Sequence, residues 1–163
     1  MRELWVWAVL LLMLCSNAGW AQKNGVDEEG HAWWQHAVFY DVYPRSFADS
    51  NNDGIGDLPG ITSKLDYLHW LGPDAIWIAP MFPSPQVDWG YDISDYYNVN
   101  PDYGTLKDMD KLLAQGKQRE IRVLLDFVLT YTSDQNKWFQ EAKSSRTNPK
   151  RDWYIWSDGK GRF

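Results

Sequence analysis

Residues 49–57, DSNNDGIGD, carry oxygen-bearing side chains at alternate positions along a glycine-rich stretch. Such oxygens are the ligands that hard cations prefer, and glycine lets the backbone curl tightly enough for them to converge. The pattern begins like an EF-hand loop, but Gly60 stands where that loop needs a glutamate. The stretch therefore predicts either a structural cation site or a turn without metal. The ligands of the cation site would be Asp49, Asn51, Asp53, the Ile55 carbonyl and Asp57.

Composition places the chain among globular proteins and draws attention to its aromatic residues. It has 163 residues, 44% of them hydrophobic and 23% charged, which is enough for one domain with a core. The net charge of −6 argues against a nucleic-acid partner, because phosphate backbones attract basic surfaces. Aromatic residues make up 16% of the chain, with 11 Trp and 9 Tyr. Most aromatic side chains fill cores, but exposed ones also stack on the apolar faces of sugar rings.

The N-terminus has the layout of a secretory signal peptide. A basic residue precedes an apolar run at 4–14, and small and polar residues then lead to Ala18 and Ala21, where cleavage is expected. We therefore expect residues 1–21 to be removed and the mature protein to be secreted and extracellular. A signal-anchor is the alternative, but the run is too short to span a bilayer, which takes about twenty residues. No membrane span is expected.

Hydrophobic patterning predicts strands that alternate with helices. Strands are expected at 37–43, 75–80 and 121–128, and helices at 61–71, 105–119 and 137–143. This alternation is typical of an α/β fold with a parallel sheet, either an open doubly wound sheet or a (β/α)8 barrel. No glycine-rich phosphate-binding motif follows the first strand. Long acidic and aromatic loops after the strands favour a barrel with a sugar site at its C-terminal face.

Six motifs, in this order and spacing, resemble one known family. They are HAVFYDVYPRSF, DSNNDGIGDLPGI, KLDYLHWLG, DAIWIAP, VDWGYDISDYYNVNPDYGT and LLDFV. Together they are similar to the N-terminal part of the catalytic domain of glycoside hydrolase family 13, the α-amylase superfamily. Within that family they look most like oligo-1,6-glucosidases and secreted insect-type maltases, which are α-glucosidases.

The resemblance implies a fold and a division of the chain. The fold would be α/β, the N-terminal part of a (β/α)8 TIM barrel with about three strands, running into the insertion that follows the third strand. The predicted division is a signal peptide at 1–21, a polar lead-in at 22–31, a partial barrel at 32–133 and the start of the inserted subdomain at 134–163.

The resemblance also implies site residues. Asp88 and Tyr91 match family positions that line the innermost sugar site, where a carboxylate can accept hydroxyl hydrogen bonds and a ring can stack beneath the pyranose. Asp126 matches an aspartate at the end of the third strand that supports the catalytic centre. These three are the predicted substrate-binding residues. In similar α-glucosidases the loop at 49–57 holds Ca²⁺ or Mg²⁺, which favours the cation site over a bare turn.

One short segment departs from the family pattern. Leu129, Thr130 and Tyr131 stand where Pro, Asn and His are expected. The missing histidine normally donates a hydrogen bond to bound glucose. Tyr131 offers one hydroxyl, but its side chain is longer, and we expect it to aim elsewhere. Asp92 and Asp95, in the same region of the family match, are expected to serve as turn and capping residues.

Three functions remain open at this level. The first is a maltase-like α-glucosidase that hydrolyses terminal α-linked glucose from maltose or short oligosaccharides. The second is a non-catalytic relative, such as the heavy chain of an amino-acid transporter, although those carry a full transmembrane helix. The third is a truncated product without activity. Retaining hydrolysis needs two carboxylates about 5 Å apart, and in this family both come from later strands. No catalytic residue is therefore predicted, and we expect this chain alone to be inactive.

Overall fold

The structure, a computed structural model, describes residues 30–157 and 159. The predicted signal peptide, 1–21, lies outside the described residues, as does most of the predicted lead-in. The chain divides into two compact units between Val38 and Phe39. The described part of the first unit contains a short 3-10 helix, η1, Trp33–Gln35. All other helices and strands belong to the second unit.

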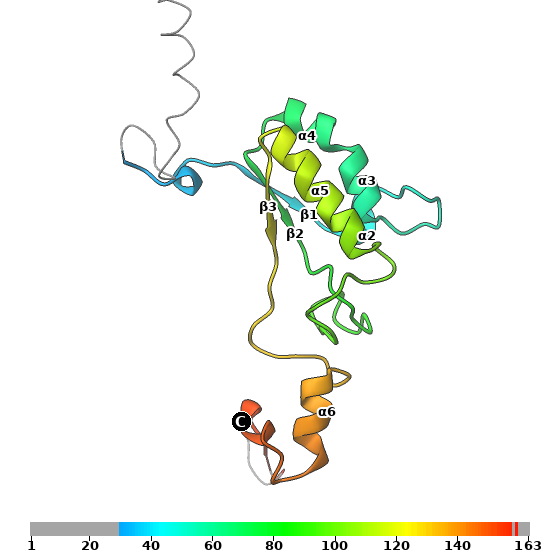
Figure 1. The fold of residues 1–163 in the computed structure, drawn as a ribbon, viewed down its shortest axis with the longest axis vertical. Coiled ribbons are helices and arrows are strands. Elements are labelled where there is room, and N and C mark those ends of the chain that lie inside the picture. The colour runs from blue at the N-terminus through cyan, green and yellow to red at the C-terminus, as the bar shows by residue number, and fades with distance from the viewer. Residues whose placement is uncertain (1–29, 158, 160–163) are drawn as a thin grey trace, which may run out of the picture. The chain divides into compact units, whose positions relative to one another are not determined.

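The second unit contains a three-stranded parallel sheet, as the alternating pattern predicts. The strands are β1, Phe39–Val42, β2, Ala75–Ile78, and β3, Arg122–Leu125. They pair in the order β1-β2-β3, and Figure 1 shows them side by side. The register aligns Val42 with Ile78 and Ile78 with Leu125, so all three strands end at the same edge. The loops that follow the strands therefore emerge together, which brings distant segments of the chain to one edge.

Helices cover one face of the sheet. They are α2, Pro44–Phe47, α3, Leu58–Ser63, α4, Leu65–Leu71, and α5, Leu106–Gln118, and Figure 1 shows α3, α4 and α5 packed on the same side. A core of apolar side chains fills the space between these layers, because burying them removes apolar surface from water. Its fully buried members include Val42, Leu58, Ile61, Leu65, Leu68, Ile76, Ile78 and Leu112.

The sequence predicts one helix at 61–71, and this prediction is wrong in detail. The helix is divided at Lys64, whose backbone adopts φ −100° and ψ 3°. Its amide donates to the Ile61 carbonyl at 3.0 Å, which ends α3, and α4 starts at the next residue. The spacing of apolar side chains continues across this break, so the sequence pattern does not predict it. The predicted end is confirmed: Gly72 has φ 95°, a left-handed conformation that glycine adopts readily.

The opposite face of the sheet is open. Phe39 is 40% exposed and Trp77 is 46% exposed, and with Leu124 they line a shallow depression of about 370 Å³. Parallel sheets are normally covered on both faces. Within the described residues, this face is uncovered.

The predicted helix near 137–143 is present as α6, Lys137–Ser144, and is followed by a second 3-10 helix, η2, Arg151–Trp153. Asn136 caps α6, with its side chain accepting from the Trp138 amide at 2.9 Å. The Trp138 ring stacks on Tyr96 with centroids 5.5 Å apart and 9° between planes. This contact connects α6 to the loop after β2. Within the described residues, no helix is both long and apolar enough to cross a membrane.

Candidate functional site

The predicted substrate-binding residues lie on two loops at the carboxyl edge of the sheet. Asp88 and Tyr91 belong to the loop after β2, and Asp126 is the first residue after β3. Ligand sites of parallel α/β folds form at this edge, because loops from several strands converge there. The Asp126 amide donates to the Ile78 carbonyl at 2.9 Å, which extends the β2–β3 pairing and fixes the residue.

The structure brings Tyr91 and Asp126 into direct contact. The Tyr91 hydroxyl donates to Asp126 Oδ2 at 3.0 Å. A turn places Tyr91 next to Asp88, since the Tyr91 amide donates to the Asp88 carbonyl at 2.9 Å. From the end of β1, the Tyr43 hydroxyl donates to the Trp89 carbonyl at 3.3 Å and holds the same turn. All three strand ends therefore contribute to the position of this turn.

Sequence reasoning missed a fourth member of the site, Tyr131. Its hydroxyl does not aim away from the site, because it donates to Asp88 Oδ2 at 3.0 Å. The signal was the departure from the family pattern at Leu129–Tyr131, but the pattern alone could not show where a longer side chain would point. Asp88, Tyr91, Asp126 and Tyr131 form what we call the Tyr–Asp cluster.

The hydroxyls of the cluster act as hydrogen-bond donors over a wide pH range. Burial, together with the hydrogen bond and charge of Asp126, raises the pKa of Tyr91 above its usual value. The hydrogen bond to Asp88, with smaller effects of burial and of neighbouring carboxylates, raises the pKa of Tyr131. Both phenols thus stay protonated at neutral pH, and each donates a hydrogen bond to a carboxylate. The cluster offers oxygen acceptors and ring faces, which suits a polyhydroxylated ligand.

Asp92 and Asp95 stabilise the loop through hydrogen bonds, as expected of turn residues, but neither caps a helix among the described residues. Asp92 is buried and accepts from the Ser84 hydroxyl and from the Val87 amide at 3.0 Å. Burial alone would raise the pKa of Asp92, but these hydrogen bonds outweigh it and lower the pKa. Asp95 accepts from the Tyr97 amide at 2.8 Å within a turn. Both carboxylates stabilise the loop that carries Asp88 and Tyr91.

The loop at 49–57 is ordered by its own side chains. Asp49 accepts from the amides of Asn51, Asn52 and Gly54 at 3.0, 2.7 and 2.8 Å. These backbone hydrogen bonds, that of Gly54 first, lower the pKa of Asp49. Asp53 accepts from the Ile55 amide at 2.7 Å. These hydrogen bonds hold the loop in a tight curl.

Asp57 has a second role that sequence reasoning did not assign. It is 5% exposed and caps α3, with Oδ1 accepting from the Gly60 amide at 2.6 Å. Its other oxygen accepts from the amide and hydroxyl of Ser50. Gly60 leaves no room for a side chain here, since a Cβ would lie 2.0 Å from the Ala48 carbonyl oxygen. The loop and the start of α3 are thus packed together around Asp57.

The loop at 49–57 contains the kind of oxygen ligands that hard cations prefer. Among the described residues, no three His, Cys, Asp or Glu side chains are grouped so that they could hold a metal ion. A cation would therefore need the Asn51 amide and the Ile55 carbonyl as well, as the sequence predicts. A carboxylate has about four lone-pair positions, so Asp49 and Asp53 keep acceptor capacity beside their backbone hydrogen bonds. The cation site stays a prediction.

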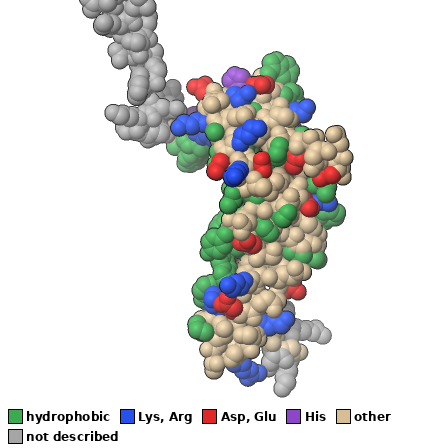
Figure 2. Space-filling view, turned by 45° about the vertical axis from the view of Figure 1, so that its right-hand side comes forward, with side chains coloured by type: hydrophobic (Ala, Val, Ile, Leu, Met, Phe, Trp, Pro, Cys, Tyr) green, Lys and Arg blue, Asp and Glu red, His purple; other side chains and the backbone are tan. Residues whose placement is uncertain are grey.

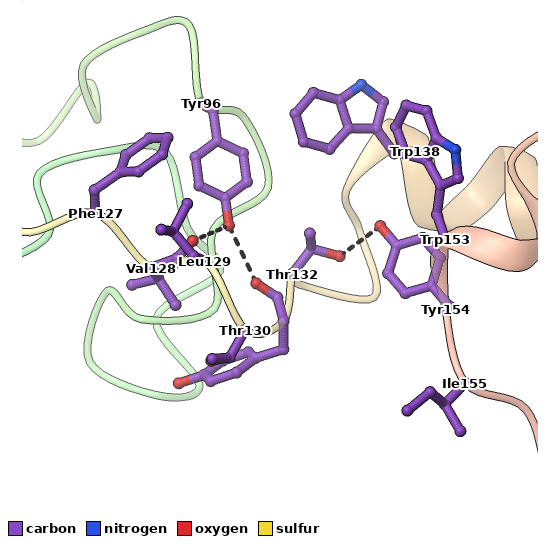
Figure 3. Close-up of a pocket in the computed structure, with 11 residues that line it drawn as sticks. Tyr96, Phe127, Val128, Leu129, Thr130, Thr132, Trp138, Trp153, Tyr154 and Ile155 are labelled. Atoms are coloured by element: carbon purple, nitrogen blue, oxygen red, sulfur yellow. Dashed lines mark hydrogen bonds between the residues drawn. The ribbon is translucent and has the colours of Figure 1, made fainter.

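An aromatic cavity of about 520 Å³ adjoins Tyr131 on the side of α6. Figure 3 shows Tyr96 and Phe127 on one side of it and Trp138, Trp153 and Tyr154 on the other. The Tyr96 hydroxyl donates to the carbonyls of Val128 and Tyr131 at 2.8 and 3.1 Å. These contacts hold the backbone that carries Tyr131. On the face drawn in Figure 2, acidic and basic side chains are intermixed.

Comparison with known proteins assigns the chain to a family. Residues 41–162 match the family model of the α-amylase catalytic domain. The chain is 53% identical over 133 residues to a probable α-glucosidase of Rhizobium meliloti, covering 82% of this chain and 24% of that protein. It is 54% identical over 127 residues to Maltase 1 of Drosophila virilis, covering 78% of this chain and 20% of that protein.

A solved structure supports the same assignment. The trehalulose synthase MutB from Pseudomonas mesoacidophila MX-45 superposes with a TM-score of 0.78 at 56% identity, over 80% of this chain and 24% of that one. The chain thus spans about a quarter of the length of the relatives it matches. The predicted fold class is confirmed: the three parallel strands are the N-terminal part of a TIM barrel. The chain belongs to the α-amylase family, glycoside hydrolase family 13, and residues 41–162 are part of its catalytic domain.

Proposed function

We propose that this chain provides the glucose-binding part of a maltase-like α-glucosidase. The complete active site would hydrolyse terminal α-linked glucose from maltose or short oligosaccharides. The observation that carries this proposal is the convergence of Asp88, Tyr91 and Asp126 at the carboxyl edge of the sheet. Relatives named α-glucosidase or maltase, from bacteria, yeasts and an insect, support the substrate class.

Each residue has a role in this proposal that its chemistry allows. Asp88 accepts hydrogen bonds from glucose hydroxyls, and the partly exposed ring of Tyr91 packs against an apolar face of the pyranose. Asp126 holds the Tyr91 hydroxyl and fixes the angle of that ring. None of these side chains is assigned as nucleophile or general acid. The two carboxylates of a retaining mechanism are not assigned to any described residue.

Two further properties are part of the proposal. The loop at 49–57 binds one Ca²⁺ or Mg²⁺ ion and keeps α3 in place below the strand ends. The protein is secreted, with residues 1–21 as its signal peptide, in the manner of insect-type maltases. N-terminal sequencing of protein from culture medium tests the second property, and a mature chain that starts at Met1 contradicts it.

Binding of methyl α-D-glucoside tests the main proposal. Chemical-shift changes in the NMR spectrum of the chain should saturate with ligand and be centred on residues 88–91 and 126. Asp88→Asn should weaken binding, because a neutral amide oxygen accepts a weaker hydrogen bond from a sugar hydroxyl than a carboxylate does. Asp110→Asn, on the exposed side of α5, makes the same charge change away from the site and should bind like the wild type. Equal affinity of all three proteins would contradict the proposal.

Hydrolysis provides a second test. The purified chain should release no p-nitrophenol from p-nitrophenyl α-D-glucoside, because the residues assigned here only bind and position sugar. Turnover that scales with this chain and survives repurification would show that the assignment of roles is wrong.

A further inference from the structure

The Tyr–Asp cluster contains two reciprocal pairs. The loop after β2 supplies Tyr91 and Asp88, and the segment after β3 supplies Asp126 and Tyr131. Each segment therefore supplies one tyrosine donor and one aspartate acceptor, and the donor–acceptor distance is 3.0 Å in both hydrogen bonds. The Tyr131–Asp88 pair joins positions 43 residues apart.

The Tyr131 hydroxyl limits what Asp88 can offer to a ligand. It engages Oδ2, and within the described residues no donor contacts Oδ1 of this carboxylate. The carboxylate is held at one oxygen and open at the other. A carboxylate held by a hydrogen bond loses rotational freedom before the ligand arrives, which reduces the entropy cost of binding.

The backbone of Tyr131 is itself fixed. Tyr96 donates to its carbonyl at 3.1 Å and to the Val128 carbonyl at 2.8 Å. Tyr96 in turn stacks on Trp138 of α6. The backbone that carries Tyr131 is thus held at several points, and this positions its hydroxyl against Asp88.

We propose that Tyr131 is a positioning residue, which holds the Asp88 carboxylate so that one defined oxygen accepts a hydroxyl of a bound glucoside. This role rests on the proposed function and names a residue that the family pattern does not provide. Tyr131 acts through Asp88. A phenol also differs from a histidine at this position, because it remains a neutral donor throughout the range from pH 5 to 8.

The pair can be tested without any sugar. In protein labelled with ¹³C at the tyrosine ring, Tyr131→Phe identifies the Tyr131 signal, and titration of that signal with base gives its pKa. Asp88→Asn should move this pKa downward, although Asp92 and Asp126 remain nearby. Asp110→Asn should not. An unchanged pKa in Asp88→Asn means that the pair does not form, and overturns the inference whatever the sugar does.

The positioning role is tested by affinity. Tyr131→Phe keeps the ring and removes the hydroxyl, and should weaken binding of methyl α-D-glucoside about threefold to tenfold, the size expected for a partly exposed hydrogen bond to a charged group. Tyr67→Phe on the exposed side of α4 is the matched control. Tyr131→His should restore binding at pH 5.5, where imidazole is a charged donor, more than at pH 8.

The outcomes separate the two proposals. Unchanged affinity in Tyr131→Phe, with weakened binding in Asp88→Asn, would leave the proposed function standing and overturn the positioning role. A wild-type chain that binds no methyl α-D-glucoside, with the Tyr131 pKa still dependent on Asp88, would overturn the proposed function and with it the role of the pair in sugar binding.

Discussion

Tyr91 and Asp126 lie 35 positions apart in the sequence, and a 3.0 Å hydrogen bond joins their side chains. One belongs to a long loop, and the other is fixed to β2 through its own backbone amide. The bond therefore joins the loop after β2 to the end of β3. In the proposed sugar site, this hydrogen bond would keep the Tyr91 ring and the Asp126 carboxylate in a constant relative position.

Removing the Tyr91 hydroxyl tests this tie. Tyr91→Phe should lower the free energy of unfolding by about 0.5–1 kcal/mol, the lower part of the range for hydrogen bonds, because the group is partly exposed. Urea denaturation measures the change. In a double-mutant cycle with Asp126→Ala, the double variant should lose less stability than the sum of the two single losses, because both substitutions remove the same hydrogen bond. Additive effects of the two substitutions would show that the bond contributes nothing.

The cation site makes a conditional prediction. Asp53→Ala should lower the melting temperature when calcium is present and have a much smaller effect in EDTA, because ligand binding stabilises only the folded chain. Differential scanning calorimetry in the two buffers gives the comparison. Asp110→Ala is the control for loss of one carboxylate. If the wild type and Asp53→Ala melt together in calcium, the loop is a turn without metal.

Asp57 should behave differently from Asp53. As the N-cap of α3, its replacement by alanine should cost about 1–2 kcal/mol even in EDTA, because the Gly60 amide loses its acceptor whether or not a cation is bound. Chemical denaturation with calcium and with EDTA measures both values. A loss confined to calcium would assign Asp57 to the cation alone.

Asp92 should contribute to the loss of stability in acid. Its pKa is lowered in the folded chain, so the carboxylate stabilises the fold above its unfolded pKa near 3.8, and that stability is lost as pH falls through the lower folded value. Asp92→Asn should therefore be less stable than wild type at pH 6 and approach it near pH 2. Urea denaturation over this pH range gives the two curves, and a constant gap between them would contradict the prediction.

The elements were predictable where periodic burial determines them. The strands at Ala75–Ile78 and Arg122–Leu125 and the helix Leu106–Gln118 follow from apolar spacing, although both strands are shorter than predicted. The break at Lys64 was not predictable, since it changes backbone angles without changing which side chains face the core. Local propensity and periodicity carry no information on such a break.

The sequence predicted three members of the candidate site, but neither the fourth nor the way the four are arranged. Family resemblance located Asp88, Tyr91 and Asp126, because those residue types stand at matching positions. It could not locate the Tyr131–Asp88 contact, which depends on the path of the segment after β3 and on the length of a tyrosine side chain. The capping role of Asp57 was hidden for a similar reason: several oxygen donors in one loop look equivalent until the helix that follows is in place.

The order of the strands has a consequence for synthesis. Because the sheet order β1-β2-β3 follows the chain, each strand can pair with its predecessor as soon as it leaves the ribosome. Phe39 pairs with Ala75, and Ala75 pairs with Arg122, so each pairing has to close a long loop first, which slows folding. The open face with Phe39 and Trp77 would then be exposed in the nascent chain while the helical face was already closed.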